Sequence, residues 1–255
     1  YIDNSNWYFQ YNLQHDVMKN AKVRKALGDA IDPKGFVDNV LKDGSQVANG
    51  LVPTSINGAN NGKYVDGRAD LLDHDTEGAK ALFEEGLKEL NMTAADVKLT
   101  YVCDDTSDSQ VYGAYFQQQW KKVLGIDVDI KPMAFQARLD AMRNGNFDIV
   151  LAGWSPDYND ALTYLDMFMQ GNGNNYGKYS STEYDTLLQQ AVAEVDPAKR
   201  QELLQKAETL LIQQDWVVYP IYFQKRSYVQ SNKVQGVTHT GFQEVDFCDG
   251  AKIVQ

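Results

Sequence analysis

The chain has 255 residues, of which 43% are hydrophobic and 11% aromatic, so it is long and apolar enough for one large globular domain or two small ones. Its net charge of −11 argues against nucleic acid as a partner, because an acidic surface repels phosphate groups. No apolar run is long enough to span a bilayer, and no basic amphipathic stretch indicates a membrane surface.

The first part of the chain predicts a strand, two helices and a loop. Residues 6–12 alternate as a strand, and apolar residues at helical spacing predict a helix over 20–31. Asp32-Pro33 is typical of the N-cap and first residue of a second helix, which runs to Leu41 and stops before a glycine. Residues 45–73 are rich in Gly and Asn, so we expect a long loop, which compact domains keep mainly for function.

The rest of the chain alternates between helices and strands. Amphipathic periodicity predicts helices over residues 75–90, 109–125, 134–143, 160–169, 181–193 and 197–214. Alternating or apolar runs predict strands over residues 97–102, 126–131, 147–151, 216–223 and 227–230, with a terminal pair around 244–254. This order of elements indicates an α/β fold.

Motifs of catalysis and metal binding are missing from the sequence. There is no GxSxG, HExxH, GxGxxG or P-loop pattern, and His15, His74 and His239 are isolated. Cys103 and Cys248 fit no zinc spacing; they could form one disulfide or stay two thiols, and we favour buried thiols because both lie in strand-like apolar stretches. We therefore expect a protein that is not an enzyme and that needs no metal or cofactor.

Four segments of the chain share their pattern with one known family. They are AKVRKALGDAIDPKGFVDNVLKDGSQVANGLVP (21–53), NFDIVLAGWSPDYNDALTYLDMF (146–168), YSSTEYDTLLQQA (179–191) and RQELLQKAETLLIQQDWVVYPIYF (200–223). Together and in this order they resemble the family 5 extracellular solute-binding proteins, the oligopeptide- and dipeptide-binding components of ABC importers. The resemblance covers nearly the whole chain.

The resemblance implies a type II periplasmic-binding-protein-like fold, in which two lobes hold the ligand between them. Residues 1–236 resemble the second ligand-binding lobe, a mixed sheet flanked by helices, and residues 237–255 a segment that returns to the first lobe. A start inside a strand, without a signal peptide or lipid-attachment cysteine, fits a chain cut from a longer one. We expect this chain to be a monomer that binds its ligand poorly alone, because half of the cleft is absent.

The resemblance also implies where the protein acts and which partners it has. Its members act outside the cytoplasm, in the periplasm or attached by a lipid to the outer face of the cell membrane. There they capture peptides and deliver them to the membrane permease subunits of the importer. We therefore expect a peptide ligand, a dipeptide or an oligopeptide, and permease subunits as the protein partners of this chain.

The resemblance assigns ligand contacts to the segment GWSPDYND, where a buried strand meets a helix. Asp157 matches the acid that holds the free amino terminus of a peptide, and an ammonium buried in a closed cleft needs such a countercharge. Trp154 would supply a flat wall for a peptide side chain, Tyr158 is a further candidate beside it, and Phe135 fits another wall.

Two features leave the role of this segment and the ligand open. The segment also fits a plain strand-to-helix turn, in which Asp160 caps the helix and Trp154 lies in the core. Some relatives carry an arginine that faces the far end of the peptide, where this chain has Leu151, and Arg143 is no evident substitute. The fold therefore also suits a binder of sugars, nickel chelates or opines, and a glycoside hydrolase that uses Asp157 with a second acid is a further alternative.

Overall fold

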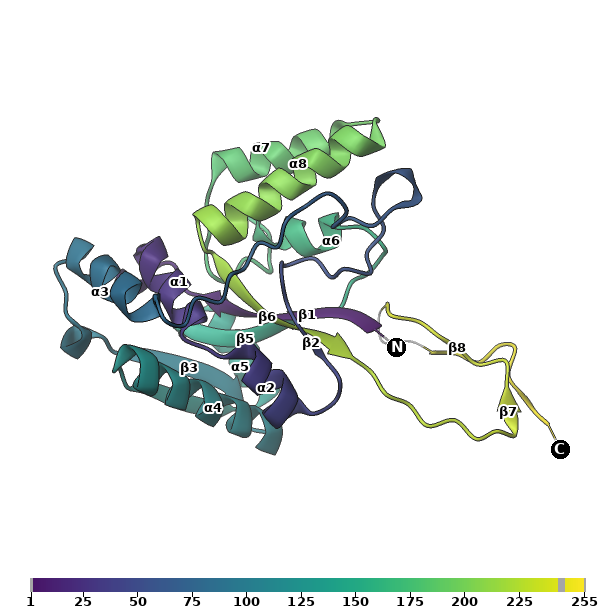
Figure 1. The fold of residues 1–255 in the computed structure, drawn as a ribbon, viewed down its shortest axis with the longest axis horizontal. Coiled ribbons are helices and arrows are strands. Elements are labelled where there is room, and N and C mark those ends of the chain that lie inside the picture. Colours follow the sequence, from purple (N-terminus) through teal and green to yellow (C-terminus); the bar gives the residue numbers. More distant parts are fainter. Residues whose placement is uncertain (1, 243–245, 255) are drawn as a thin grey trace.

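The computed structural model describes residues 2–242 and 246–254, which form a mixed sheet between two layers of helices (Figure 1). The sheet has the strand order β2-β6-β1-β5-β3-β4. β1 runs antiparallel to β5 and β6, whereas β3 runs parallel to β4 and β5. The strands are β1 (Ile2–Tyr11), β2 (Gln46–Val47), β3 (Leu99–Asp104), β4 (Val128–Met133), β5 (Ile149–Trp154) and β6 (Val218–Lys225). The expected α/β fold with a mixed sheet is confirmed.

Helices cover both faces of the sheet, and each face has its own apolar core (Figure 1). One layer contains α1 (Ala21–Asp29), α2 (Pro33–Phe36), α3 (Ala79–Glu89) and α4 (Ser107–Leu124). The other contains α6 (Leu162–Leu165), α7 (Thr182–Ala193) and α8 (Pro197–Thr209), while α5 (Phe135–Arg143) follows β4. No helix in the described ranges is both long and apolar enough to cross a membrane.

Most predicted elements are confirmed, with shifted ends. Asp32 caps α2 and Pro33 is its first residue, as expected, and the helical path continues as a π-helical turn to Leu41. Helix α3 begins later than predicted, because residues 75–78 form a turn in which the Gly78 N–H donates to the Asp75 carboxylate (2.9 Å). β5 runs three residues beyond its predicted end, so Trp154 is its last residue.

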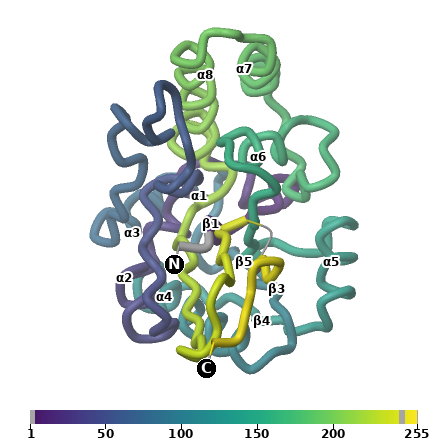
Figure 2. The backbone as a smooth tube through the Cα atoms, turned by 90° about the vertical axis from the view of Figure 1, so that its right-hand side faces the viewer, coloured from purple at the N-terminus to yellow at the C-terminus, as the bar shows by residue number. Residues whose placement is uncertain are grey.

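Residues 226–242 and 246–254 belong to a tail that extends away from the sheet and faces the viewer in Figure 2. The strand predicted over 227–230 is wrong: this stretch is irregular, and Val229 is fully exposed. Two short strands, β9 (Asp246–Phe247) and β10 (Lys252–Ile253), do occur near the end, although residues 244 and 245 lie outside the described residues. They pair with β8 (Thr238–His239) and β7 (Val234–Gln235), respectively.

The two cysteines have different environments. Cys103, in β3, is a buried free thiol, as expected. The expectation of burial is wrong for Cys248, which is a free, exposed thiol. Its apolar sequence neighbourhood misled the prediction, because residues 247–254 contribute no side chain to either core.

The loop predicted over 45–73 is confirmed, and α8 fastens it to the body. Glu208 of α8 is fully buried and accepts hydrogen bonds from the N–H groups of Leu51 (2.7 Å) and Val52 (3.1 Å). Its other oxygen forms an ion pair with the buried Arg68 at 2.6 Å. Apart from the short strand β2 and a 3₁₀ turn over Ala59–Asn61, this loop therefore depends on a buried charge pair.

The same loop ends at His74, which belongs to a buried hydrogen-bond chain. The Tyr219 hydroxyl lies 2.6 Å from an Asp29 carboxylate oxygen and 3.1 Å from Nδ1 of His74, whose Nε2 lies 3.1 Å from the Ala48 carbonyl oxygen. Lys25 forms an ion pair with the same Asp29. The chain links α1, β6 and the two ends of the loop.

We expect the stability of the protein to fall on mild acidification because of His74. Burial lowers the pKa of this imidazole from its ordinary value of 6.5. The unfolded chain therefore binds a proton more readily, so the free energy of unfolding should decrease as the pH falls through about 6.5 and level off below the folded pKa. Burial raises the pKa of Asp29, and a raised carboxyl pKa changes the stability in the opposite direction as the pH falls.

Urea unfolding at several pH values between about 5.5 and 7.5 measures this slope. His74→Asn removes the imidazole and keeps a residue that tolerates the positive φ of this position (49°). The variant should show a flatter pH dependence over this range. An unchanged slope in the variant would contradict the assignment to His74.

Candidate ligand-binding site

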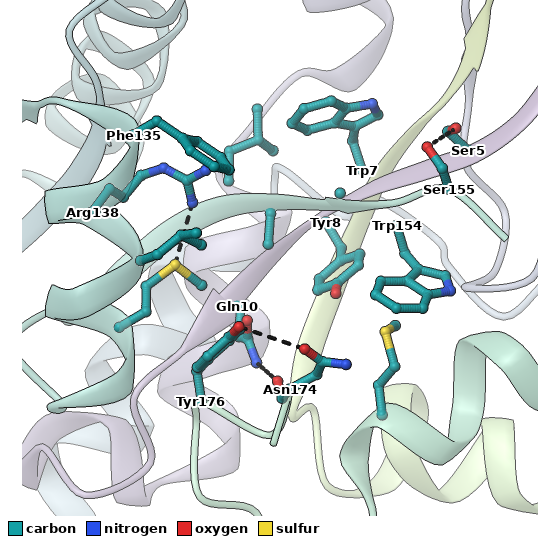
Figure 3. Close-up of a pocket in the computed structure, with 16 residues that line it drawn as sticks. Ser5, Trp7, Tyr8, Gln10, Phe135, Arg138, Trp154, Ser155, Asn174 and Tyr176 are labelled. Carbon is teal, nitrogen blue, oxygen red and sulfur yellow. Dashed lines mark hydrogen bonds between the residues drawn. The ribbon is translucent and has the colours of Figure 1, made fainter. Parts of the chain in front are cut away.

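A cavity of about 530 Å³ lies at the carboxyl end of β5, beside residues 5–10 of β1 (Figure 3). The carboxyl ends of parallel strands are where open α/β sheets usually bind ligands. The lining comes from β1, α5, β5 and the loop after α6. It consists of Ser5, Trp7, Tyr8, Gln10, Phe135, Arg138, Leu139, Met142, Leu151, Ala152, Gly153, Trp154, Ser155, Met167, Asn174 and Tyr176.

Aromatic rings from four segments form much of the wall. Figure 3 shows Phe135 and Trp154 on opposite sides, Trp7 and Tyr8 between them, and Tyr176 below. Trp7 packs against the core on one face of the sheet and Tyr8 belongs to the core on the other, and both side chains line the cavity. Flat rings of this kind bind apolar groups and keep water away from polar ones.

Polar groups of the lining are mostly neutral. The hydroxyls of Ser5 and Ser155 are hydrogen-bonded at 2.8 Å, and the Gln10 amide donates to the Asn174 carbonyl at 3.4 Å. Within the described ranges, Arg138 is the charged residue of the lining, and no Asp or Glu contributes to it. Its guanidinium is already paired with a carboxylate of β3, at 2.7 Å.

The turn that follows β5 is acidic. Asp160 forms a two-point ion pair with Arg200 of α8, at 2.7 and 2.9 Å. Partial burial, followed by the charge of Asp157, raises the pKa of Asp166, and partial burial with the nearby acids raises the pKa of Tyr158. Arg200 pairs with Asp160, and Asp157 and Asp166 add further carboxylates to this region, whose acidic character suits a cationic group.

Comparison with known proteins identifies the family. Residues 1–176, more than half of the chain, match the family model described as bacterial extracellular solute-binding proteins, family 5, middle part. The chain belongs to family 5 of the bacterial extracellular solute-binding proteins.

Relatives in this family are about twice as long as this chain. It is 32% identical over 246 residues to the oligopeptide-binding protein OppA of Bacillus subtilis, covering 94% of this chain and 44% of that protein. The substrate-binding domain of an oligopeptide ABC transporter from Bacillus anthracis aligns with a TM-score of 0.90 at 31% identity. OppA of Listeria monocytogenes bound to peptide aligns with a TM-score of 0.88 at 29% identity. Each of these two alignments includes 100% of this chain and 50% of the chain of known structure.

In this family 5 chain, the predicted site residues separate into two groups. Phe135 and Trp154 line the cavity, and Trp154 is half-buried with its indole N–H donating to the Thr163 hydroxyl (3.1 Å). Asp157 and Tyr158 are exposed on the acidic turn, outside the cavity lining. The structure thus places two of the four residues together and the other two beside them.

The alternative expectations for the segment are also partly met. Asp160 accepts a hydrogen bond from the Leu162 N–H at 2.9 Å and so orders the entry into α6, although the N-cap residue of this helix is Ala161. Leu151, which stands where some relatives carry an arginine, does line the cavity. Arg143 is exposed and pairs with Asp140 at 3.0 Å, so it does not replace that arginine.

Sequence reasoning missed several lining residues, among them Trp7, Arg138 and Tyr176. The spacing of Phe135, Arg138 and Met142 by three and four residues would have placed them on one face of α5. No comparable signal marks Trp7 or Tyr176, because Trp7 is one of several aromatic residues in β1 and Tyr176 lies in an irregular loop.

Gly153→Ala should destabilise the protein by disturbing Trp7. The Trp7 ring lies against Gly153, and a Cβ atom there would come within 2.8–3.0 Å of its ring carbons. The ring is also stacked on Tyr222 (5.8 Å, 4°), and its N–H donates to Gln224 at 2.7 Å, so it has little freedom to move. Overpacking of this kind costs about 1–3 kcal/mol.

Urea unfolding of the variant measures this loss. Gly173→Ala is the matched control, because it adds the same methyl group at a glycine with nothing within 4 Å. We expect the control to be neutral or slightly stabilising. Equal stability of the two variants would show that Trp7 is not held as the geometry indicates.

Proposed function

We propose that the polypeptide containing this chain is the binding protein of a peptide ABC importer, working outside the cytoplasm. It would capture peptides and deliver them to the permease subunits in the membrane. The observation that carries the proposal is the aromatic-lined cavity at the carboxyl end of β5 in a chain of family 5. Relatives of known structure bind peptide, as the Listeria protein does.

Four residues are proposed as ligand contacts. Trp154 and Phe135 would form walls for a peptide side chain, which their place in the cavity lining supports. Asp157 would hold the free amino group, with Tyr158 beside it, and the acidic character of their turn supports this role. Because Asp157 is exposed on this chain, it would bind an amine strongly only once a second surface covers the turn and excludes water.

We also propose that residues 1–236 form one wall of a two-lobed cleft and that residues 237–255 belong with the other lobe. The exposed apolar side chains of Phe247 and Ile253 support a partner surface for residues 237–255. A cleft of this kind would surround the ligand on both sides, whereas one wall leaves it wet.

Two alternatives differ in what the cavity would hold. A glycoside hydrolase needs two facing carboxylates, and the cavity lining within the described ranges offers none. The relatives named above are binding proteins of transporters, which also favours binding over catalysis. A sugar, chelate or opine would occupy the same cavity as a peptide.

Native mass spectrometry of the protein, expressed with the residues that flank this sequence in its gene, tests the proposal. We expect co-purified ligands with the masses of short peptides, and exchange against an added tripeptide of known sequence. A homogeneous sugar or metal chelate in the same position, not displaced by peptide, would overturn the peptide assignment.

A further inference from the structure

Helix α8 holds two segments that are far apart in the sequence through one row of polar side chains. Gln201 accepts a hydrogen bond from the Ala59 N–H at 2.6 Å, and Gln205 donates to the Tyr64 carbonyl at 2.7 Å. Glu208 extends the same face of the helix, since residues three or four apart lie above one another, and Arg200 precedes Gln201 at the start of the row. Three of these contacts reach the 45–73 loop, and Arg200 reaches the turn after β5.

Among these contacts, the one between Arg200 and the turn has the most specific geometry. Its two guanidinium nitrogens bind the two oxygens of Asp160 at 2.7 and 2.9 Å, and both side chains are only 29% exposed. A planar fork of this kind fixes direction as well as distance. The neighbouring Asn159 accepts a hydrogen bond from the Asn57 N–H at 2.9 Å, so the turn is also tied to the loop.

Packing alone does not hold the turn in place. A cavity of about 230 Å³ lies between the turn, the loop and the start of α8, lined by Asp160, Arg200 and Asn57 among others. Space of this size lets a chain segment shift once its polar contacts are broken. Residues 154 and 155, at the other end of the turn, line the candidate ligand cavity.

We propose that Arg200 is a positioning residue for ligand binding: it fixes the turn over residues 155–160 through Asp160 without touching the ligand. The inference rests on the proposed function and deepens it. A correctly held turn presents Asp157 to the ligand's amino group and Trp154 to the cavity. Loosening the turn raises the ordering cost that binding must overcome.

Two single variants separate positioning from a simple charge effect. Arg200→Gln leaves Asp160 uncompensated and makes the turn more negative. Asp160→Asn removes a negative charge but keeps a side-chain oxygen that can accept the Leu162 N–H. If only charge mattered, the two variants would change the affinity for a cationic peptide amine in opposite directions. If Arg200 positions the turn, both variants weaken binding, by about 5- to 50-fold, and the double variant is no worse than either.

The assay is calorimetric titration of a tripeptide with a free amino terminus and of its N-acetylated form into the protein with its natural flanking residues. A general structural role would lower the affinity for both peptides by the same factor, whereas positioning predicts a larger loss for the free amine. Lys199→Gln is the matched control, because it removes a cation from the same turn of α8. The Lys199 side chain is 69% exposed, and its ion pair with Asp196 is long, at 4.0 Å. The variant should bind like the wild type.

Hydrogen exchange of the ligand-free protein tests the same idea without a peptide. The amides of residues 157–160 should exchange faster in Arg200→Gln and Asp160→Asn, and at the wild-type rate in Lys199→Gln. Unchanged exchange, or affinities that move in opposite directions, would overturn the positioning role. If no peptide binds the wild type, the proposed function fails, and the exchange rates still decide whether Arg200 holds the turn.

Discussion

Replacing Glu208 with alanine should lower the free energy of unfolding by about 3–5 kcal/mol. The carboxylate is fully buried, pairs with Arg68 at 2.6 Å and accepts the N–H groups of Leu51 and Val52. Without it, the guanidinium of Arg68, whose side chain is only 6% exposed, has lost its countercharge in the interior. An isolated buried charge is far more costly than the pair.

Urea unfolding followed by circular dichroism measures the effect. Glu202→Ala removes a carboxylate from an exposed position of the same helix and should change the stability by no more than about 0.5 kcal/mol. Removing both charges, in Arg68→Met with Glu208→Leu, should restore part of the loss. A loss below about 1 kcal/mol in Glu208→Ala would mean that the ion pair does not hold the loop.

The second large effect concerns ligand affinity. Asp157→Ala should weaken the binding of a peptide with a free amino terminus by about 2–5 kcal/mol, or roughly 30- to 5000-fold, because it leaves a desolvated ammonium without its partner. Tyr158→Phe removes only a hydroxyl from the adjacent side chain and should have a much smaller effect. Calorimetry with the protein in its natural length is the measurement.

The acetylated peptide distinguishes an amine contact from a turn contact. It should bind the wild type poorly and respond little to Asp157→Ala. If Asp157 instead only shapes the turn, Asp157→Asn should keep both the fold and the affinity, because Asn satisfies turn hydrogen bonds as well as Asp does. Equal affinities of wild type, Asp157→Asn and Asp157→Ala, at unchanged melting temperature, would refute the amine contact.

Local patterns were enough to predict most of the fold. The Asp32-Pro33 and Asp196-Pro197 pairs mark helix starts by capping and a fixed φ, and both helices begin there. The prediction failed where an element depends on a distant partner. Residues 227–230 carry strand-forming side chains but are irregular in the structure, and strand propensity without pairing does not make a strand.

The site was harder to predict for the same reason. Trp154 and Phe135 could be identified because each lies in a recognisable segment. Arg138 lines the cavity only through the orientation of α5, and Tyr176 through a loop that has no regular structure. Positions of this kind are set by tertiary packing, which a single sequence does not display.

The position of β1 has a consequence for how the chain folds. β1 lies between β5 and β6 in the sheet. One edge of β1 is therefore hydrogen-bonded to a strand far along the sequence, with Gln10 opposite Val218. During synthesis, one edge of β1 stays unpaired until residues 218–225 emerge from the ribosome. Contacts between such distant segments make folding slow and leave open strand edges exposed to aggregation. We therefore expect nascent chains stopped before β6 to remain protease-sensitive and dependent on chaperones, even though nearly every helix of both layers has already been made.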